Sequence, residues 1–348
     1  MTITGSRRVL AKLEVGAFKK IQSSMRRRGL IDFGSGGRSS MEAHEKNLRP
    51  SDVIIRDLVS LGDFRQVEAI EREIWSLADI DVLPPTVAIA LQESGNHWIG
   101  AFDRQKLVGF ACGFFGVENQ RLNIHSHMLG VLPKYQNGDL GYRLKLAQRE
   151  RAFGVKVNLS ADPKYGSLGI REITWTFDPL QSRNAHLNFT KLGAFSQRYK
   201  ADLYGPDTSS PLHQNGTDRL WITWPIASRR VQKRLAGEDS RAATLDALST
   251  LAPLIRFDAD GAPVRTDLAA SLARQRIAIE IPSDILGIEK ENPTLAQDWR
   301  AATRWAFTEA LNAGFFVTEF CRHVRGQQGP GVYLLEKLSS GDTQEFPR

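Results

Sequence analysis

Apolar residues recur in two regular patterns from Val53 to about Lys337. Short runs rich in β-branched and aromatic residues predict strands, and apolar residues at helical spacing predict amphipathic helices. The predicted strands are 53–58, 98–102, 107–117, 123–132, 173–177, 220–224, 277–281, 315–320 and 332–335. The predicted helices are 62–77, 140–153, 181–192 and 294–313. This mixture of strands and helices predicts an α/β fold.

The net charge of the chain, +7, comes from its first fifty residues. They hold eleven lysines and arginines against four acidic residues, and the other 298 residues carry 35 charges of each sign. Three interpretations of this tail stand: a flexible extension ahead of an alternative start at Met41, an arm that binds an anionic surface or nucleic acid, or an organelle transit peptide. This charge separates a basic tail (1–50) from the rest of the chain. The rest is divided into a folded domain (51–228) and a C-terminal α/β extension (229–348).

Composition excludes several classes of protein. With 41% hydrophobic residues the chain has enough apolar side chains for a core, and its two cysteines, Cys112 and Cys321, cannot form a disulfide framework. No apolar run reaches the 18 residues of a membrane span, and no histidine or cysteine pattern has metal-ligand spacing. We therefore expect a cytoplasmic protein without a metal or a membrane partner. Beyond the tail the chain has no net charge, which does not favour nucleic acid.

The stretch from Leu129 to Tyr142 carries the clearest chemical signal. A strand is ended by Pro133, a polar turn containing Gly138 follows, and a helix begins near Leu140. Backbone N–H groups at a helix N-terminus bind anions, and glycines let a ligand approach the backbone closely. The turn lacks the spacing of a dinucleotide fingerprint or of a P-loop. It predicts either an anion-binding site or a purely structural turn.

This stretch also resembles the acyl-CoA-binding motif of the GNAT superfamily of N-acyltransferases. The pyrophosphate loop of that family begins with Arg or Gln and has Gly or Ala at its sixth position, matched here by Gln136 and Gly141. At the fourth position, where the family usually has glycine, this chain has Asp139. Four more segments resemble an uncharacterised, long-chain bacterial branch of predicted GNAT enzymes: 125–129, 144–149, 175–180 and 192–194.

The resemblance implies a mixed, mostly antiparallel sheet flanked by helices, with acetyl-CoA or another acyl-CoA as co-substrate. Backbone groups of the turn and an asparagine of the later helix would contact the coenzyme. The residues implied in cofactor binding are Leu129, Val131, Gln136, Asn137, Gly138, Leu140, Gly141, Tyr142 and Asn184. Because a carboxylate that faces a pyrophosphate is unfavourable, we expect Asp139 to point away or to weaken cofactor binding.

Acyl transfer to an amine needs a group that takes a proton from the amine. His125 and His127 lie on the strand that leads to the turn, and a histidine titrates near neutral pH. Either is a candidate base, with His127 preferred, and the alternative is that both are structural polar residues of the strand. Asp178 either binds the acceptor ammonium or caps the next helix.

The leaving thiolate needs an acid, which in the family is usually a tyrosine four residues before the glycine that closes the later helix. This chain has Phe189 there, so Tyr199 or Tyr204 is the candidate substitute, and backbone groups with solvent are the alternative. Three basic residues of the preceding helix either contact the phosphates or, as we prefer, lie on its exposed face: Arg143, Lys145 and Arg149.

We therefore expect an acyl-CoA-dependent N-acyltransferase that moves an acetyl or succinyl group to a primary amine of a small molecule, with amino acids among the options. The alternative is a non-catalytic, regulatory acyl-CoA-binding protein of GNAT-like fold, motivated by Asp139 and Phe189. The C-terminal extension either shapes the acceptor pocket or forms the interface of a homodimer. Nucleic-acid binding through the tail is the weakest alternative.

Overall fold

The computed structural model describes residues 53–118, 121–158, 167–205, 210, 213–238, 251–322 and 329–338. The chain divides into two compact units, Met1–Asn47 and Leu48–Arg348, and every described residue belongs to the second. The basic tail, residues 1–50, lies outside the described ranges, so its three interpretations stay predictions.

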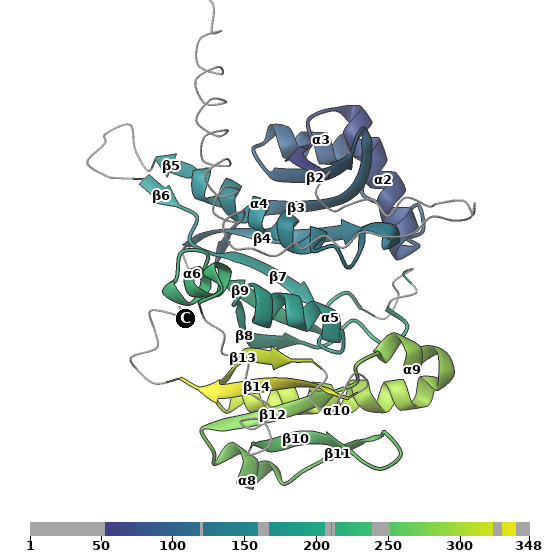
Figure 1. Ribbon diagram of the computed structural model, residues 1–348, viewed down its shortest axis with the longest axis vertical. Helices are drawn as coiled ribbons and strands as arrows, with labels where there is room; N and C mark the ends of the chain where they lie inside the picture. Colours follow the sequence, from purple (N-terminus) through teal and green to yellow (C-terminus); the bar gives the residue numbers. More distant parts are fainter. Residues whose placement is uncertain are drawn as a thin grey trace, which may run out of the picture. The chain divides into compact units, whose positions relative to one another are not determined.

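A twelve-stranded sheet runs through the second unit in the order β1-β2-β3-β4-β7-β9-β8-β13-β14-β12-β10-β11 (Figure 1). Its strands are β1 (Ile54–Asp57), β2 (His97–Asp103), β3 (Lys106–Glu118), β4 (Arg121–Val131), β7 (Ile173–Phe177), β8 (Phe195–Lys200), β9 (Arg219–Trp224), β10 (Ala252–Phe257), β11 (Pro263–Arg265), β12 (Arg276–Ile281), β13 (Phe315–Cys321) and β14 (Gly331–Lys337). A separate hairpin joins β5 (Lys156–Asn158) to β6 (Ser167–Gly169).

The helices connect these strands. They are α2 (Leu61–Trp75), α3 (Pro85–Glu93), the 3-10 helix η2 (Pro133–Tyr135), α4 (Leu140–Gly154), α5 (Ser182–Ala185), the π-helix η4 (His186–Lys191), α6 (Arg229–Ala236), α8 (Leu268–Leu272), α9 (Ile285–Glu291) and α10 (Pro293–Asn312).

Most neighbouring strands of the sheet are antiparallel. Within the described residues, the parallel neighbours are β4 with β7 and β10 with β12. The mixed, mostly antiparallel sheet with flanking helices and a C-terminal α/β extension is therefore confirmed. Because the sheet continues through both predicted parts, the boundary at residue 228 stays a prediction.

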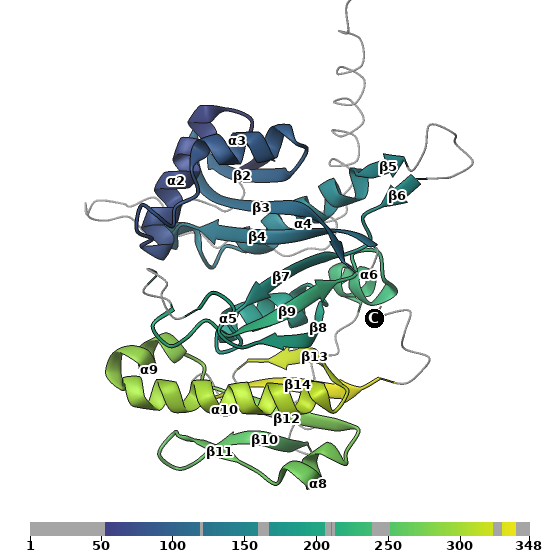
Figure 2. The same ribbon diagram turned by 180° about the vertical axis from the view of Figure 1, so that it is seen from behind.

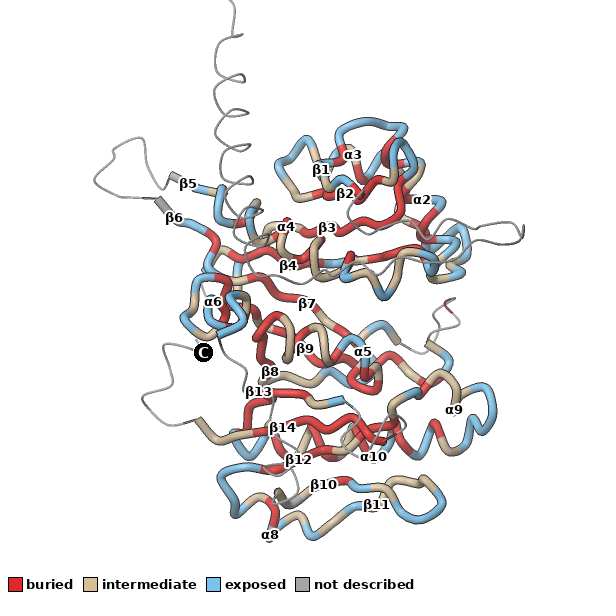
Figure 3. Tube along the Cα trace, in the orientation of Figure 1, coloured by how far each residue is buried: buried red, intermediate tan, exposed pale blue. Residues whose placement is uncertain are grey.

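Helices α2 and α4 cover opposite faces of the first four strands. Gly130 of β4 lies against Ile74 and Trp75 of α2, whereas Gly109, opposite Val131, faces Leu144 of α4. Because neighbouring residues of a strand point to opposite faces, the two helices lie on either side of β4. Figure 3 shows the buried backbone of β2, β3 and β4 between these layers.

The C-terminal strands pack against α10, which contacts β10, β11, β12 and β13 as well as β8 (Figure 2). Trp299 and Phe307 of α10 are fully buried in the same core as Trp224 of β9 and Phe189 of η4. Side chains from both predicted parts therefore form one core. The backbone is less continuous here, since β13 meets β8 through one residue pair, Val317 with Ser196.

The sequence misassigned several elements. Helix α3, which is not among the predicted helices, begins at the Pro84-Pro85 pair because proline suits the first turn of a helix. The helix predicted over 181–192 is one α-helical turn followed by a π-helix. The predicted elements also do not include strand β8 or, in the C-terminal part, α8, α9, β10 and β11. No helix of the described residues is long and apolar enough to cross a membrane.

Candidate functional site

Strands β4 and β7 form a fork. They pair in parallel at two positions, Ile124 with Ile173 and His125 with Thr174. Beyond His125, the ladder of β4 continues with β3 as far as Val131, and β7 diverges from it (Figure 1). The backbone groups of β4 that face β7 are therefore free of ladder partners along this half of the strand.

The turn after β4 places a helix N-terminus at the open end of this fork. Asn137 and Asp139 both adopt the left-handed conformation, with φ of 68° and 57°, which Asn and Asp tolerate better than most residues. Asp139 is the N-cap of α4, yet its side chain makes no capping bond. The N–H groups of Leu140, Gly141 and Tyr142, in the first turn of α4, have no partner within the helix. A helix N-terminus of this kind is able to bind an anion, and we call this turn with the first turn of α4 the cradle.

Two basic side chains reach this cradle from the other side of the fork. Arg183 of α5 donates to Gln136 Oε1 at 3.0 Å, while Gln136 Nε2 donates to Val131 O at 2.9 Å. Lys191 of η4 lies 2.5 Å from Asp139 Oδ1. The Asp139 carboxylate thus faces a cation, and an incoming diphosphate would compete with it for Lys191.

The predicted cofactor residues lie in the cradle, on the free half of β4 and on α5 across the fork. Leu129 and Val131 lie on the free half of β4, and Leu129 Cδ2 is 3.5 Å from the position that a Cβ on Gly141 would occupy. Tyr142 is half-buried under Lys191, whose Nζ lies 5.8 Å from the ring centre. Asn184 is exposed on α5, across the fork from the cradle and next to Arg183. Their roles in binding stay predictions.

His125 lies where the fork begins and is held there. Its Nδ1 is 3.1 Å from Thr174 Oγ1 on β7, and its ring lies 4.9 Å from that of Trp221. Burial, together with the positive charges of His127, Lys145 and Arg198, lowers the pKa of His125 to about 4. At neutral pH this imidazole is uncharged and a weak base.

His127 lies one step further into the fork and is exposed. Met128 pairs with Cys112 and Ser126 pairs with Gly113, so His127 is the extra residue of a β-bulge. A bulge leaves the backbone of the extra residue outside the ladder. The ring lies 5.0 Å from Phe114, and partial burial lowers its pKa below the usual value. His127 therefore offers both an imidazole and a backbone N–H at the fork.

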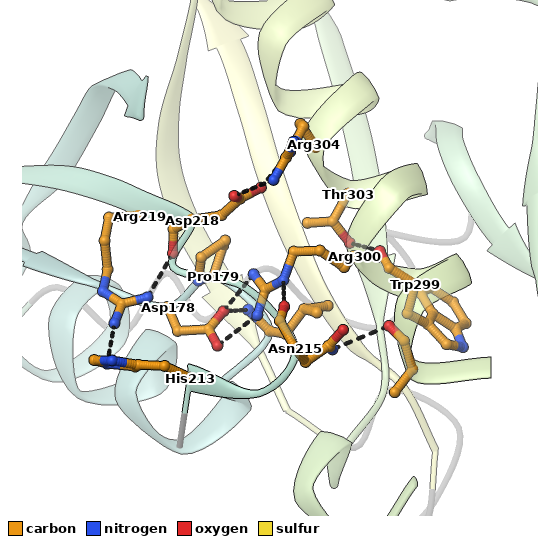
Figure 4. A network of polar contacts seen from close by, with 12 residues as sticks. Asp178, Pro179, His213, Asn215, Asp218, Arg219, Trp299, Arg300, Thr303 and Arg304 are labelled. Carbon is orange, nitrogen blue, oxygen red and sulfur yellow. Dashed lines mark hydrogen bonds and ion pairs between the residues drawn. The ribbon is translucent and has the colours of Figure 1, made fainter. Parts of the chain in front are cut away.

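Asp178 belongs to a different network, drawn in Figure 4. Its carboxylate forms a bidentate ion pair with Arg300 of α10, at 2.8 and 2.7 Å, and accepts the N–H of Leu180 at 2.9 Å. Arg300 also donates to the backbone oxygen of Asn215. The ion pair is buried, with side chains 11% and 7% exposed. Asp178 is thus already occupied by a cation and by a turn N–H.

Tyr199 belongs to the same part of the molecule. Its hydroxyl donates to Asp218 Oδ2 at 2.5 Å, and its ring stacks on Phe307 of α10 at 5.7 Å. Burial and the Asp218 carboxylate raise the pKa of Tyr199. The other candidate, Tyr204, is exposed, with its hydroxyl 3.3 Å from Thr176 of β7. The structure therefore does not bring Asp178 and Tyr199 together with the histidines of the fork.

A cavity of about 640 Å³ opens beside this network, between α10 and the turn at 214–216. Arg300 and Arg304 line it, but both guanidinium groups are engaged by aspartates. The cavity is separate from the cradle, whose residues do not line it. We base the candidate site on the fork because its free backbone groups and histidines are there.

Lys145 is buried, so its predicted place on the exposed face of the helix is wrong. Lys145 is 3% exposed, and its Nζ lies over the ring of Trp175 at 3.8 Å. Lys145 and Gln148 share the stripe of Gly141 and Ala152 on α4, at spacings of three and four residues. The position of Lys145 on this stripe indicates that it is buried. Its charge, which is typical of an exposed residue, favoured the opposite prediction.

No group of three or more possible metal ligands occurs in the part of the chain that the structure describes. The site that the described residues form is an anion cradle joined to a fork between strands, with two histidines and a buried lysine where the strands part.

No protein-family model matches the chain, and no curated protein does. Among solved structures, the ribosomal-protein-S18-alanine N-acetyltransferase from Escherichia coli matches with 15% identity and a TM-score of 0.36, over 51% of this chain and 95% of its own. A GNAT-family acetyltransferase from Streptococcus pneumoniae matches with 16% identity and a TM-score of 0.36, over 49% and 97%. Arabidopsis thaliana NAA60 in complex with acetyl-CoA matches with 12% identity and a TM-score of 0.39, over 49% and 97%. GNAT acetyltransferases are thus among the solved structures that are similar to this chain, aligned to about half of its length.

Proposed function

We propose that this protein is an acyl-CoA-dependent N-acyltransferase of the GNAT type, acting on a primary amine of a small molecule. The observation that carries the proposal is the fork between β4 and β7 with the N-terminus of α4 at its open end. A helix N-terminus suits a diphosphate, and strand backbone without ladder partners suits an extended arm with amide groups. Coenzyme A combines these two features.

The reaction follows from the groups at the closed end of the fork. His127 takes the proton from the attacking amine, since its exposed imidazole has a lowered pKa and is largely neutral at pH 7. The backbone N–H of the bulge donates to the oxygen that becomes negative as the amine adds to the thioester. The two strands hold donor and acceptor in one ternary complex.

Asp178 and Tyr199 have no direct part in this proposal. Their side chains are engaged by Arg300 and Asp218, so they support the end of β7 and its packing on α10. Acetyl and succinyl groups both stay open as the acyl group. A homodimer and a cytoplasmic location stay predictions.

Cofactor binding is tested with two valine variants at opposite ends of α4. In Gly141→Val the added Cβ lies 3.5 Å from Leu129, an ordinary contact, and the larger side chain adds bulk between the first turn of α4 and β4. In Gly154→Val nothing lies within 4 Å of the added Cβ. By calorimetry with acetyl-CoA and succinyl-CoA, we expect the first variant to bind at least tenfold more weakly than wild type and the second to bind equally. Equal binding by Gly141→Val would overturn the cradle.

Thiol release with a panel of primary amines separates an enzyme from a regulatory protein. A transferase releases free coenzyme A in proportion to the amide formed. Binding of acyl-CoA without thiol release for any amine would favour the non-catalytic alternative, which the lack of a tyrosine at Phe189 motivates.

A further inference from the structure

Lys145 is buried without an acidic partner. Its Nζ donates to Ser126 Oγ at 2.8 Å and to Gln148 Oε1 at 3.3 Å, and no carboxylate of a described residue pairs with it. The third N–H is left to the face of Trp175 rather than to an oxygen. Among the described lysines it is the one that is buried. An ammonium held by neutral groups alone is unfavourable to bury, so its retention calls for a role.

The groups around Lys145 leave its charge uncompensated. Cys112 of β3 is fully buried, which raises the pKa of its thiol to about 12, and the neutral His125 of β4 has a pKa of about 4. The side facing β7 is Trp175, which carries no charge. Burial accordingly lowers the pKa of Lys145 to about 7. At neutral pH the amine is therefore present in both protonation states.

Lys145 lies where the fork closes. The last paired residues are His125 and Thr174, and the next residues along the two strands, Ser126 and Trp175, are those that contact Nζ. From Val131, next to the cradle, to Ser126 is about 17 Å along a strand. A pantetheine arm that starts at the cradle and follows β4 brings its thioester toward this position.

The reaction lacks an acid elsewhere in the fork. Phe189, at the position where a tyrosine is expected, is fully buried between Phe177 and Tyr333, at ring distances of 6.1 and 5.7 Å. The hydroxyl of Tyr199 is bound to Asp218. Lys145 is therefore a cationic proton donor at the closed end of the fork, where such a thiolate would form.

We propose that Lys145 is the acid that protonates the departing thiolate of coenzyme A. The inference rests on the function proposed above. The amine nitrogen bonds to the thioester carbon and loses its proton to His127. The carbon–sulfur bond then breaks with its electron pair on sulfur, and a proton passes from Nζ to sulfur to give the free thiol. Lys145 regains a proton from solvent, and Ser126 with Gln148 holds its side chain.

The test is the pH profile of kcat for Lys145→Met, which keeps the length of the side chain and removes the proton. Because the acid must be protonated, wild-type kcat should fall as the pH rises above about 7. In the variant we expect kcat to be roughly a hundredfold lower at neutral pH, with this alkaline decline abolished and acyl-CoA affinity unchanged. Lys156→Met, which removes an exposed lysine just after α4, should keep the wild-type profile.

A second variant guards against a folding defect. Lys145→Arg keeps the charge but has no proton to release near neutral pH, so it too should lose the alkaline decline. A variant that keeps the wild-type kcat, or loses activity while the alkaline decline stays, would overturn the inference. If wild-type protein neither binds acyl-CoA nor releases thiol, the proposed function itself fails, which is a distinguishable outcome.

Discussion

Asp139 shows how one side chain sets the strength of the proposed anion site. The aspartate caps α4 in a left-handed conformation and pairs with Lys191 across the fork. Asparagine tolerates the same backbone conformation, so Asp139→Asn removes the charge with little change in the turn. The substitution also frees Lys191 for the diphosphate.

We expect Asp139→Asn to bind acyl-CoA roughly fivefold more tightly at low salt, which corresponds to about 1 kcal/mol for one charge in a solvated setting. The gain should shrink in 1 M salt. Calorimetry measures both. Asp79→Asn is the matched control, since Asp79 pairs with Arg72 at the exposed end of α2. Weaker binding by Asp139→Asn would mean that the carboxylate helps to shape the cradle.

Glu71 of α2 is a residue where pH controls stability. Its carboxyl group is fully buried, with Leu83 N–H donating to Oε2, and burial raises its pKa to about 7. In the unfolded chain, this carboxyl group has the ordinary glutamate pKa of 4.5. The contribution of the protonated Glu71 to the unfolding free energy is therefore fully present below pH 4.5, and it is lost as the pH rises to about 7.

Glu71→Gln should consequently raise the unfolding free energy at pH 8 by up to about 3 kcal/mol, and change it little at pH 4.5. Urea unfolding at the two pH values gives the comparison. Glu73→Gln, an exposed neighbour on the same helix, should have a small effect at both. A gain for Glu71→Gln that is equal at both pH values would contradict the titration.

At the level of elements, the π-helix η4 determines where the residue at position 189 points. Phe189 packs against Phe177 and Tyr333 in the core. A hydroxyl added there would be buried, with a cost of about 1–3 kcal/mol if it finds no partner. Position 189 therefore does not serve as an acid in this chain.

Phe189→Tyr should lower the unfolding free energy by about 1–3 kcal/mol without raising kcat. Urea unfolding and thiol release measure the two quantities. An increase in kcat with a new pH dependence would show that η4 can present this side chain to the fork.

The sequence predicted elements better than it predicted contacts. The strand, proline and polar turn around Pro133 located the cradle, because these signals are local. The burial of Lys145 was missed because its charge outweighed its position on the buried stripe of α4. The π-helix was missed because its apolar spacing matches an α-helix. The partner of Asp178, 122 residues away on α10, has no local signal at all.

For the whole molecule, the Asp178–Arg300 pair connects the end of β7 to the C-terminal extension. Removing one partner leaves a buried charge without compensation, so we expect Arg300→Met to lower the unfolding free energy by about 3–5 kcal/mol. The double variant Asp178→Asn with Arg300→Met should recover a large part of that loss. A urea-unfolding double-mutant cycle gives the coupling, and simple additivity of the two single variants would contradict it.

The single residue pair between Val317 and Ser196 has a mechanical consequence. Every other strand neighbour in the large sheet shares at least two such rungs. Contacts between side chains, rather than backbone hydrogen bonds, therefore hold β8 and β13 together. Tension applied across the sheet would first separate β8 from β13. The strands on either side of this junction would keep their own backbone hydrogen bonds.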